Sequence, residues 1–132
     1  MSKRIFIIED DANISAGLQA KFSSDGYTVF ASSGTENIQE LKSKIKIAKT
    51  EYVILDIILP ETDGFEVLYE IKADHDISKI PVFIFTSLAD KDTKKKCETL
   101  GAAHVFIKGK LMLDDFVIKV KKIIDNREKV KI

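Results

Sequence analysis

Short apolar runs alternate with amphipathic segments along the whole of this 132-residue sequence. The runs are rich in Ile, Val and Phe and have the length of buried strands. The segments between them place apolar residues three or four positions apart, as helices do. Strands that are apolar along their whole length are typical of a parallel sheet covered by helices on both faces. The sequence therefore predicts an α/β domain with five strand–helix pairs, (βα)5, wound on both sides of a parallel sheet.

The predicted elements are separated by turn and capping residues. Gly26 and Gly101 follow the first and fourth predicted helices, where glycine commonly ends a helix, and Asp11 is expected to cap the first helix. We predict strands at residues 4–9, 27–31, 52–56, 80–86 and 103–107. We predict helices at residues 13–25, 64–73, 90–100 and 113–126, and a further helix marked by Ile38, Leu41, Ile45 and Ala48. Residues 1–126 are expected to form one domain, and residues 127–132 a charged tail or the stub of a linker.

Composition narrows the class of protein. The 21 basic and 21 acidic side chains balance, so no global charge points to nucleic acid or to a membrane surface. No apolar stretch reaches the roughly 18 residues that a membrane helix needs, and the N-terminus lacks a signal-peptide pattern. The single cysteine, Cys97, excludes a disulfide within the chain. These features favour a globular protein of the cytoplasm.

Polar side chains stand at the carboxyl ends of four predicted strands. Glu9 and Asp10 follow the first strand, and Asp56 ends the strongly apolar third strand. Thr86 ends the fourth strand and Lys108 follows the fifth. Because all strands of a parallel sheet end at the same edge, we expect these residues to converge although they are far apart in sequence.

Such a cluster has the chemistry of phosphoryl transfer. Neighbouring carboxylates repel one another unless a cation lies among them, and oxygen ligands of this kind suit Mg²⁺. Lys108 adds an ammonium group and Thr86 a hydroxyl, both of which can bind phosphoryl oxygens. The carboxylate of Asp56 is then a candidate nucleophile whose product is an acyl phosphate.

Four motifs in order resemble a response-regulator receiver domain, the CheY-like module of two-component signalling. They are IIEDD at 7–11, LDIILPETDG at 55–64, FTS at 85–87 and IK at 107–108. The resemblance covers essentially the whole chain and implies the flavodoxin-like strand order 2-1-3-4-5. It implies that Asp56 is the phosphoacceptor, Thr86 the switch hydroxyl and Lys108 the phosphoryl-binding lysine. The implied ligands of Mg²⁺ (or Mn²⁺) are Glu9, Asp10, Asp56 and the backbone carbonyl of Ile58.

The resemblance also implies partners. A histidine kinase or a phosphotransfer protein would donate the phosphoryl group to Asp56. A downstream protein would bind a face formed by the fourth helix, the fifth strand and the fifth helix. We expect no binding of nucleic acid or membrane by this domain, no enzymatic turnover beyond self-catalysed phosphotransfer, and a monomer or weak dimer.

Three positions depart from the pattern of the family. Gly109 stands where receivers usually carry a proline joined by a cis peptide bond; a trans bond and a shifted loop are expected, because a cis bond without proline costs about 2.5–4 kcal/mol. Val105 replaces the aromatic residue that usually couples to the threonine, and alternation turns Phe106 to the other face of the sheet. Ile58 and Leu88, two residues after Asp56 and Thr86, are apolar and cannot orient an attacking water, so we expect slow self-dephosphorylation.

Two other functions remain open. Phosphohydrolases of the haloacid-dehalogenase type use the same aspartate nucleophile, but they need a second aspartate two residues later, where this sequence has Ile58. A degenerate receiver that binds partners without being phosphorylated is the other alternative, and the changes at Val105 and Gly109 give it some weight.

Overall fold

A parallel sheet of five strands in the order β2-β1-β3-β4-β5 forms the centre of the molecule, as predicted. The computed structural model describes residues 2–130. The strands are β1 (Arg4–Ile8), β2 (Thr28–Ser32), β3 (Tyr52–Leu55), β4 (Val82–Thr86) and β5 (His104–Ile107). The helices are α1 (Ala12–Ser24), α2 (Ile38–Ile47), α3 (Gly64–Ala73), α4 (Lys91–Thr99) and α5 (Leu113–Lys129), with a short 3-10 turn, η1 (Lys108–Lys110), after β5.

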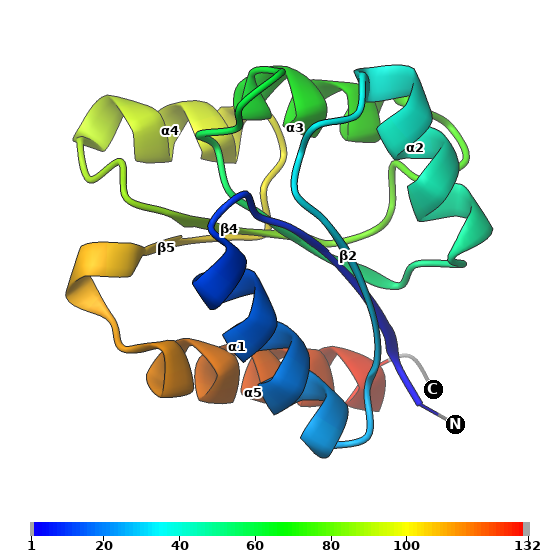
Figure 1. Ribbon diagram of the computed structural model, residues 1–132, viewed down its shortest axis with the longest axis vertical. Helices are drawn as coiled ribbons and strands as arrows, with labels where there is room; N and C mark the ends of the chain where they lie inside the picture. The colour runs from blue at the N-terminus through cyan, green and yellow to red at the C-terminus, as the bar shows by residue number, and fades with distance from the viewer. Residues whose placement is uncertain (1, 131–132) are drawn as a thin grey trace.

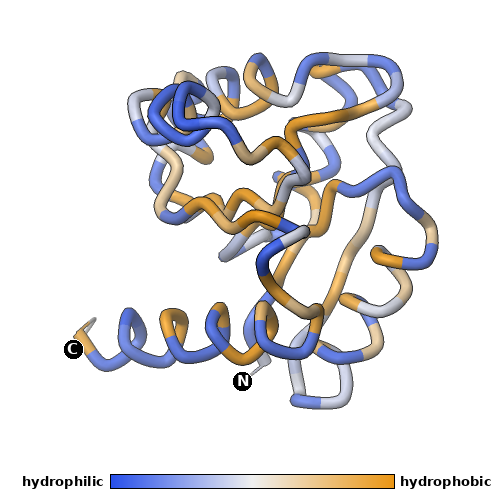
Figure 2. The backbone as a smooth tube through the Cα atoms, turned by 90° about the vertical axis from the view of Figure 1, so that its left-hand side faces the viewer, coloured by the Kyte–Doolittle hydropathy of each residue, from blue (hydrophilic) through white to orange (hydrophobic). Residues whose placement is uncertain are grey.

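Helices cover both faces of the sheet, as Figure 1 shows: α2, α3 and α4 lie on one side, and α1 and α5 on the other. Successive strand residues point to opposite faces, so each strand supplies side chains to two separate apolar cores. In β1, Phe6 and Ile8 pack under α2–α4, whereas Ile5 and Ile7 pack against α1 and α5. The hydrophobic segments of the tube in Figure 2 accordingly gather between the layers. Across residues 2–130, no helix combines the length and the apolar character needed to cross a membrane.

The predicted boundaries differ from the observed ones by one or two residues except at two places. Asp11 caps α1 as expected, with its carboxylate accepting from the backbone N–H groups of Asn13 and Ile14. The turn η1 was not predicted. Helix α5 continues three residues beyond the predicted end because Glu128, near its C-terminus, accepts a hydrogen bond from Tyr52 on β3 and pairs with Lys3 at 2.6 Å. The position of the domain boundary stays a prediction, and residues 131–132 of the predicted tail lie outside the described residues.

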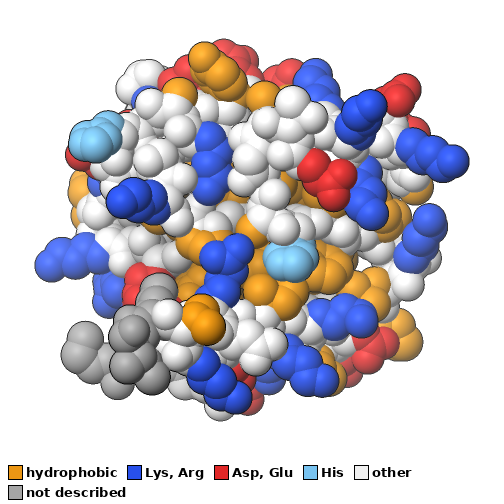
Figure 3. Space-filling view, turned by 180° about the vertical axis from the view of Figure 1, so that it is seen from behind, with side chains coloured by type: hydrophobic (Ala, Val, Ile, Leu, Met, Phe, Trp, Pro, Cys, Tyr) orange, Lys and Arg blue, Asp and Glu red, His pale blue; other side chains and the backbone are white. Residues whose placement is uncertain are grey.

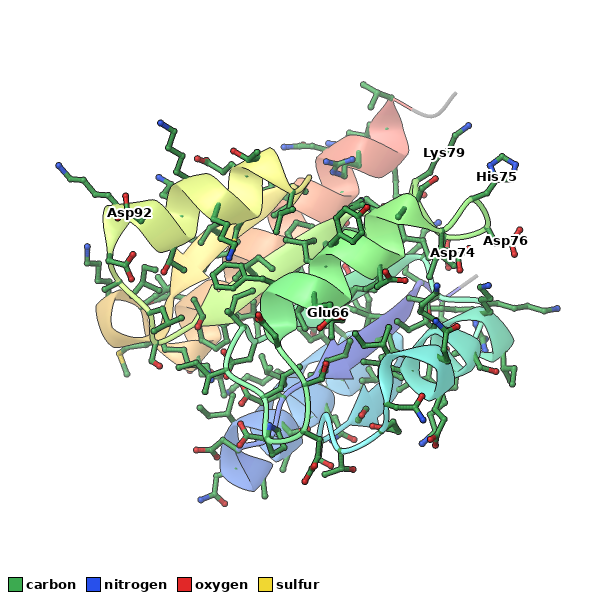
Figure 4. All side chains as sticks on the ribbon, turned by 90° about the horizontal axis from the view of Figure 1, so that it is seen from above. Glu66, Asp74, His75, Asp76, Lys79 and Asp92 are labelled. Carbon is green, nitrogen blue, oxygen red and sulfur yellow. The ribbon has the colours of Figure 1, made fainter. Side chains whose placement is uncertain are left out.

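An ion-pair network fastens α2 to the segment after α3. The carboxylate of Asp74 lies 2.9 Å from the ammonium of Lys46 and 3.2 Å from that of Lys42. It also accepts a hydrogen bond from the backbone N–H of Asp76. These contacts, the one with Lys46 first, lower the pKa of Asp74 to about 2. Figure 4 shows Asp74, His75 and Asp76 together beside the end of α3.

We predict that Asp74→Asn lowers the thermal midpoint of unfolding at about pH 7. The pKa of Asp74 is depressed in the folded state, so the charged carboxylate stabilises the fold above its unfolded pKa of about 4. That contribution is lost as pH falls through the folded value of about 2. The difference in midpoint between the variant and the unaltered protein, measured across pH, should therefore shrink between about pH 4 and pH 2. Asp76→Asn, at a carboxylate that is largely exposed, is the control with a smaller effect; a constant difference at every pH would contradict the prediction.

Candidate functional site

Four of the predicted site residues, Glu9, Asp10, Asp56 and Lys108, meet at the carboxyl edge of the sheet. β1, β3, β4 and β5 are consecutive neighbours in the sheet, and each ends at this edge. Glu9 follows β1, Asp56 follows β3, and Lys108 follows β5. The side chains of these three residues are in direct contact although 99 positions separate Glu9 from Lys108.

Asp56 is held by two different donors. Its side chain is almost entirely buried, with 4% of the residue exposed. One carboxylate oxygen, Oδ1, accepts a hydrogen bond from the backbone N–H of Ile58 at 3.1 Å. The other, Oδ2, accepts from the Lys108 ammonium at 2.8 Å. These two hydrogen bonds stabilise a carboxylate that is almost completely shielded from bulk water at the end of an apolar strand.

The ammonium of Lys108 joins two buried carboxylates. Besides Asp56, it lies 2.7 Å from Oε1 of Glu9, whose other oxygen accepts a hydrogen bond from the backbone N–H of Asp11 at 3.1 Å. Burial raises the pKa of Glu9, and the hydrogen bond from Lys108 only partly offsets that rise. Burial alone would lower the pKa of Lys108, but its hydrogen bonds to Asp56 and Glu9 outweigh burial and raise it. The site therefore has one fixed positive charge among its acids.

Asp10 completes a cluster with the donor set of a cation site. Carboxylate oxygens of Glu9, Asp10 and Asp56 all lie within 4.8 Å of one another, and Asp10 is exposed to solvent. Three carboxylates and one ammonium leave an excess of negative charge, and hard oxygen donors are the ligands that Mg²⁺ and Mn²⁺ favour. The residues present therefore fit a divalent cation. Whether the Ile58 carbonyl is a further ligand stays a prediction.

Thr86 lies at the same edge, at the end of β4. The residue is fully buried, and its hydroxyl oxygen accepts a hydrogen bond from the backbone N–H of Leu88 at 3.4 Å. The hydroxyl is thus engaged by the loop that follows β4. Its role as a switch residue stays a prediction.

Comparison with known proteins decides the family. Residues 5–120 match the family described as response regulator receiver domain. The chain belongs to this family. Relatives include the transcriptional regulatory protein CrdR of Helicobacter pylori, which is 31% identical over 122 residues, covering 92% of this chain and 55% of that protein. Response regulator RR06 of Streptococcus pneumoniae is 32% identical over 98 residues, covering 74% of this chain and 42% of that protein.

A solved structure shares the fold over nearly the whole chain. The CheY-like receiver domain protein of Methanospirillum hungatei superposes with a TM-score of 0.83 at 24% identity, covering 98% of both chains. The present chain spans only about half the length of the curated relatives named above.

The departures from the receiver pattern have clear structural counterparts. Residues 2–130 contain no cis peptide bond, so the trans bond expected before Gly109 is confirmed, and Lys108–Lys110 form η1. Val105 packs in the core under α4. The ring of Phe106 points to the opposite face of the sheet, as predicted, and meets the ring of Phe116 edge-on at 5.2 Å. Lys108 reaches both carboxylates despite the missing proline.

Sequence reasoning missed the aromatic residue beside Lys108. The ammonium lies 5.7 Å from the centroid of the Phe85 ring, on the neighbouring strand β4. An aromatic residue in a buried strand is usually a core residue, so nothing in the sequence distinguished Phe85 from Phe83.

Gly64 shapes the loop that follows Asp56. The loop turns back through a bridge between Ile58 and Asp63, and the N–H of Gly64 donates to the carbonyl of Ile57 at 3.0 Å. A Cβ atom at position 64 would lie 2.3 Å from that carbonyl oxygen and 2.4 Å from the Cα of Ile57. Only glycine allows this close approach, which sets the path of the loop between Asp56 and α3.

We predict that Gly64→Ala destabilises the domain by about 1–3 kcal/mol, because the added methyl group meets backbone that cannot move without displacing the loop. Denaturant unfolding would measure the change, and Mg²⁺ titration should show weaker binding. Gly109→Ala is the matched control, because nothing lies within 4 Å of its added Cβ. Equal losses of stability in the two variants would contradict the prediction.

Proposed function

We propose that this receiver domain accepts a phosphoryl group on Asp56 from a phosphohistidine donor in a reaction that depends on Mg²⁺ (or Mn²⁺). The single observation that supports this most is the setting of Asp56: a buried carboxylate whose two oxygens are oriented by the Ile58 N–H and the Lys108 ammonium. Histidine kinases and phosphotransfer proteins are the partners that donate such a group in two-component signalling.

The transfer itself needs little covalent chemistry from the protein. A carboxylate oxygen of Asp56 forms a bond to phosphorus while the bond from phosphorus to the donor imidazole nitrogen breaks, and that nitrogen takes up a proton. The electron pair of the broken bond stays on the imidazole. Lys108, already 2.8 Å from Asp56, is placed to pair with the charge on the phosphoryl oxygens.

Glu9, Asp10 and Asp56 are the residues that would hold the divalent cation, with the Ile58 carbonyl as a further ligand. When bound, the cation neutralises charge on the phosphoryl oxygens. The protein contributes the three carboxylates, within 4.8 Å of one another. Lys108 places a positive charge beside two of them, Glu9 and Asp56.

The consequence of phosphorylation is a change of a protein-binding face. The phosphoryl group adds negative charge and acceptor oxygens next to Thr86 and Lys108. We propose that movement of these two residues alters the face formed by α4, β5 and α5. Figure 3 views the molecule from behind, where hydrophobic side chains gather among basic ones. The exposed lysines of α4 are Lys91, Lys94, Lys95 and Lys96.

The domain limits of 1–126, the cytoplasmic location and the monomeric or weakly dimeric state remain predictions. The chain spans about half the length of the curated relatives named above. Any output function of a larger protein that contains this domain is therefore also a proposal.

We predict that incubation with acetyl phosphate and Mg²⁺ adds one phosphoryl group to the protein. Intact mass spectrometry measures the gain, which should be absent from Asp56→Asn because the amide is not a nucleophile for this transfer. Omission of Mg²⁺ should prevent the gain as well. A folded protein that never gains a phosphoryl group would instead favour the degenerate receiver that binds its partners constitutively.

We also predict slow loss of the phosphoryl group. Ile58 and Leu88 are apolar, so neither side chain can orient an attacking water. The double variant Ile58→Asn, Leu88→Glu should therefore lose the group faster than the unaltered protein when decay is followed in Mg²⁺. Identical decay rates would show that these positions do not control the lifetime.

A further inference from the structure

We propose that Phe85 is a positioning residue for Lys108, holding the ammonium at the site by contact with the face of its ring. This inference rests on the proposed phosphotransfer to Asp56 and deepens it. Receivers usually have a proline after this lysine, which here is Gly109. We assign the positioning of the Lys108 ammonium to a core aromatic residue instead.

The ring of Phe85 is itself fixed. Phe85 lies on β4, pairs in register with Phe106 on β5, and is only 3% exposed. Its ring stacks on that of Phe116 from α5, with centroids 3.9 Å apart and an angle of 11° between the planes. Phe116 in turn meets Phe106 edge-on. Three elements therefore determine where the Phe85 ring stands below Lys108.

The side chain of Lys108 is 16% exposed, and two contacts of its ammonium are with groups that bound ligands would engage. Lys108 begins the turn η1, and Gly109 beside it has open space around the position of a Cβ. The partners of its ammonium are Glu9 and Asp56. These are the oxygens that a cation and a phosphoryl group would engage. The contact with Phe85, at 5.7 Å, does not compete with them.

The ring also bounds a space into which the lysine could otherwise turn. A cavity of about 300 Å³ lies next to Lys108 and Phe85, with Ile14, Leu111 and Leu113 among its other lining residues. The negative face of an aromatic ring attracts an ammonium within about 6 Å of its centroid, whereas an apolar side chain without a ring does not. With leucine at position 85, the ammonium loses this attraction and gains freedom to leave the carboxylates.

The test compares two leucine variants in acetyl phosphate and Mg²⁺. Phe85→Leu should slow phosphorylation of Asp56 by roughly three- to tenfold, the range expected for loss of a partly buried cation–π contact. Phe83→Leu is the matched control, because Phe83 lies on the same strand and face, is fully buried and has aromatic neighbours of its own. It should leave the rate unchanged. In a Lys108→Ala background, Phe85→Leu should have no further effect.

A second measurement does not require phosphorylation. In NMR relaxation, the order parameter of the Lys108 ε-methylene group should fall in Phe85→Leu, because the ammonium gains freedom, and should be unchanged in Phe83→Leu. Trifluorophenylalanine at position 85 keeps the ring but weakens its negative face, so it should slow the reaction as leucine does. An unchanged order parameter of Lys108 in Phe85→Leu, or equal slowing by both leucine variants, would overturn the inference. Absence of phosphorylation in the unaltered protein would overturn the proposed function, while the order parameter would still decide the role of Phe85.

Discussion

One ammonium group between two buried carboxylates is the interaction on which the site depends. Lys108 contacts Glu9 and Asp56 at 2.7 and 2.8 Å, and both acids are nearly inaccessible to solvent. Two buried carboxylates side by side repel one another, and the lysine places a positive charge between them. Asp10, the third acid of the cluster, is exposed to solvent. An arrangement of this kind can exchange its internal ion pairs for bonds to a metal and a phosphoryl group.

The sheet makes this arrangement possible. Its three central strands, β1, β3 and β4, are buried on both faces, so their side chains pack into the two apolar cores and polar groups lie near the strand ends. Parallel pairing then brings four of those ends to one edge. Gly64 closes the loop after Asp56 by a backbone approach that no other residue allows, and this keeps the loop close to the site.

The departures from the receiver pattern leave the contacts of the site in place, since Lys108 reaches both Glu9 and Asp56. Val105, partly buried, packs against the core cluster that contains Cys97 of α4, at the position where a receiver usually has an aromatic residue. Three aromatic side chains lie on the opposite face, where Phe85, Phe106 and Phe116 connect the surroundings of Lys108 to α5. These rings give the proposed switch a packed connection to α5, whereas the recorded contact of the Thr86 hydroxyl is with the backbone N–H of Leu88.

The sequence by itself determined the five strand–helix pairs, the layered fold and the residues that meet at the sheet edge. The reason is that the spacing of apolar and polar residues along the chain predicts both the type of each element and which of its residues are buried. It located Glu9, Asp10, Asp56, Thr86 and Lys108 through motif and position. Tertiary structure alone decided the partners of the lysine, the turn η1 and the extension of α5 to Lys129, which depends on Tyr52 and Lys3 far away in the chain. It also singled out Phe85 from the other core aromatics. Contacts between distant residues follow from packing in three dimensions, and no local pattern of the sequence carries them.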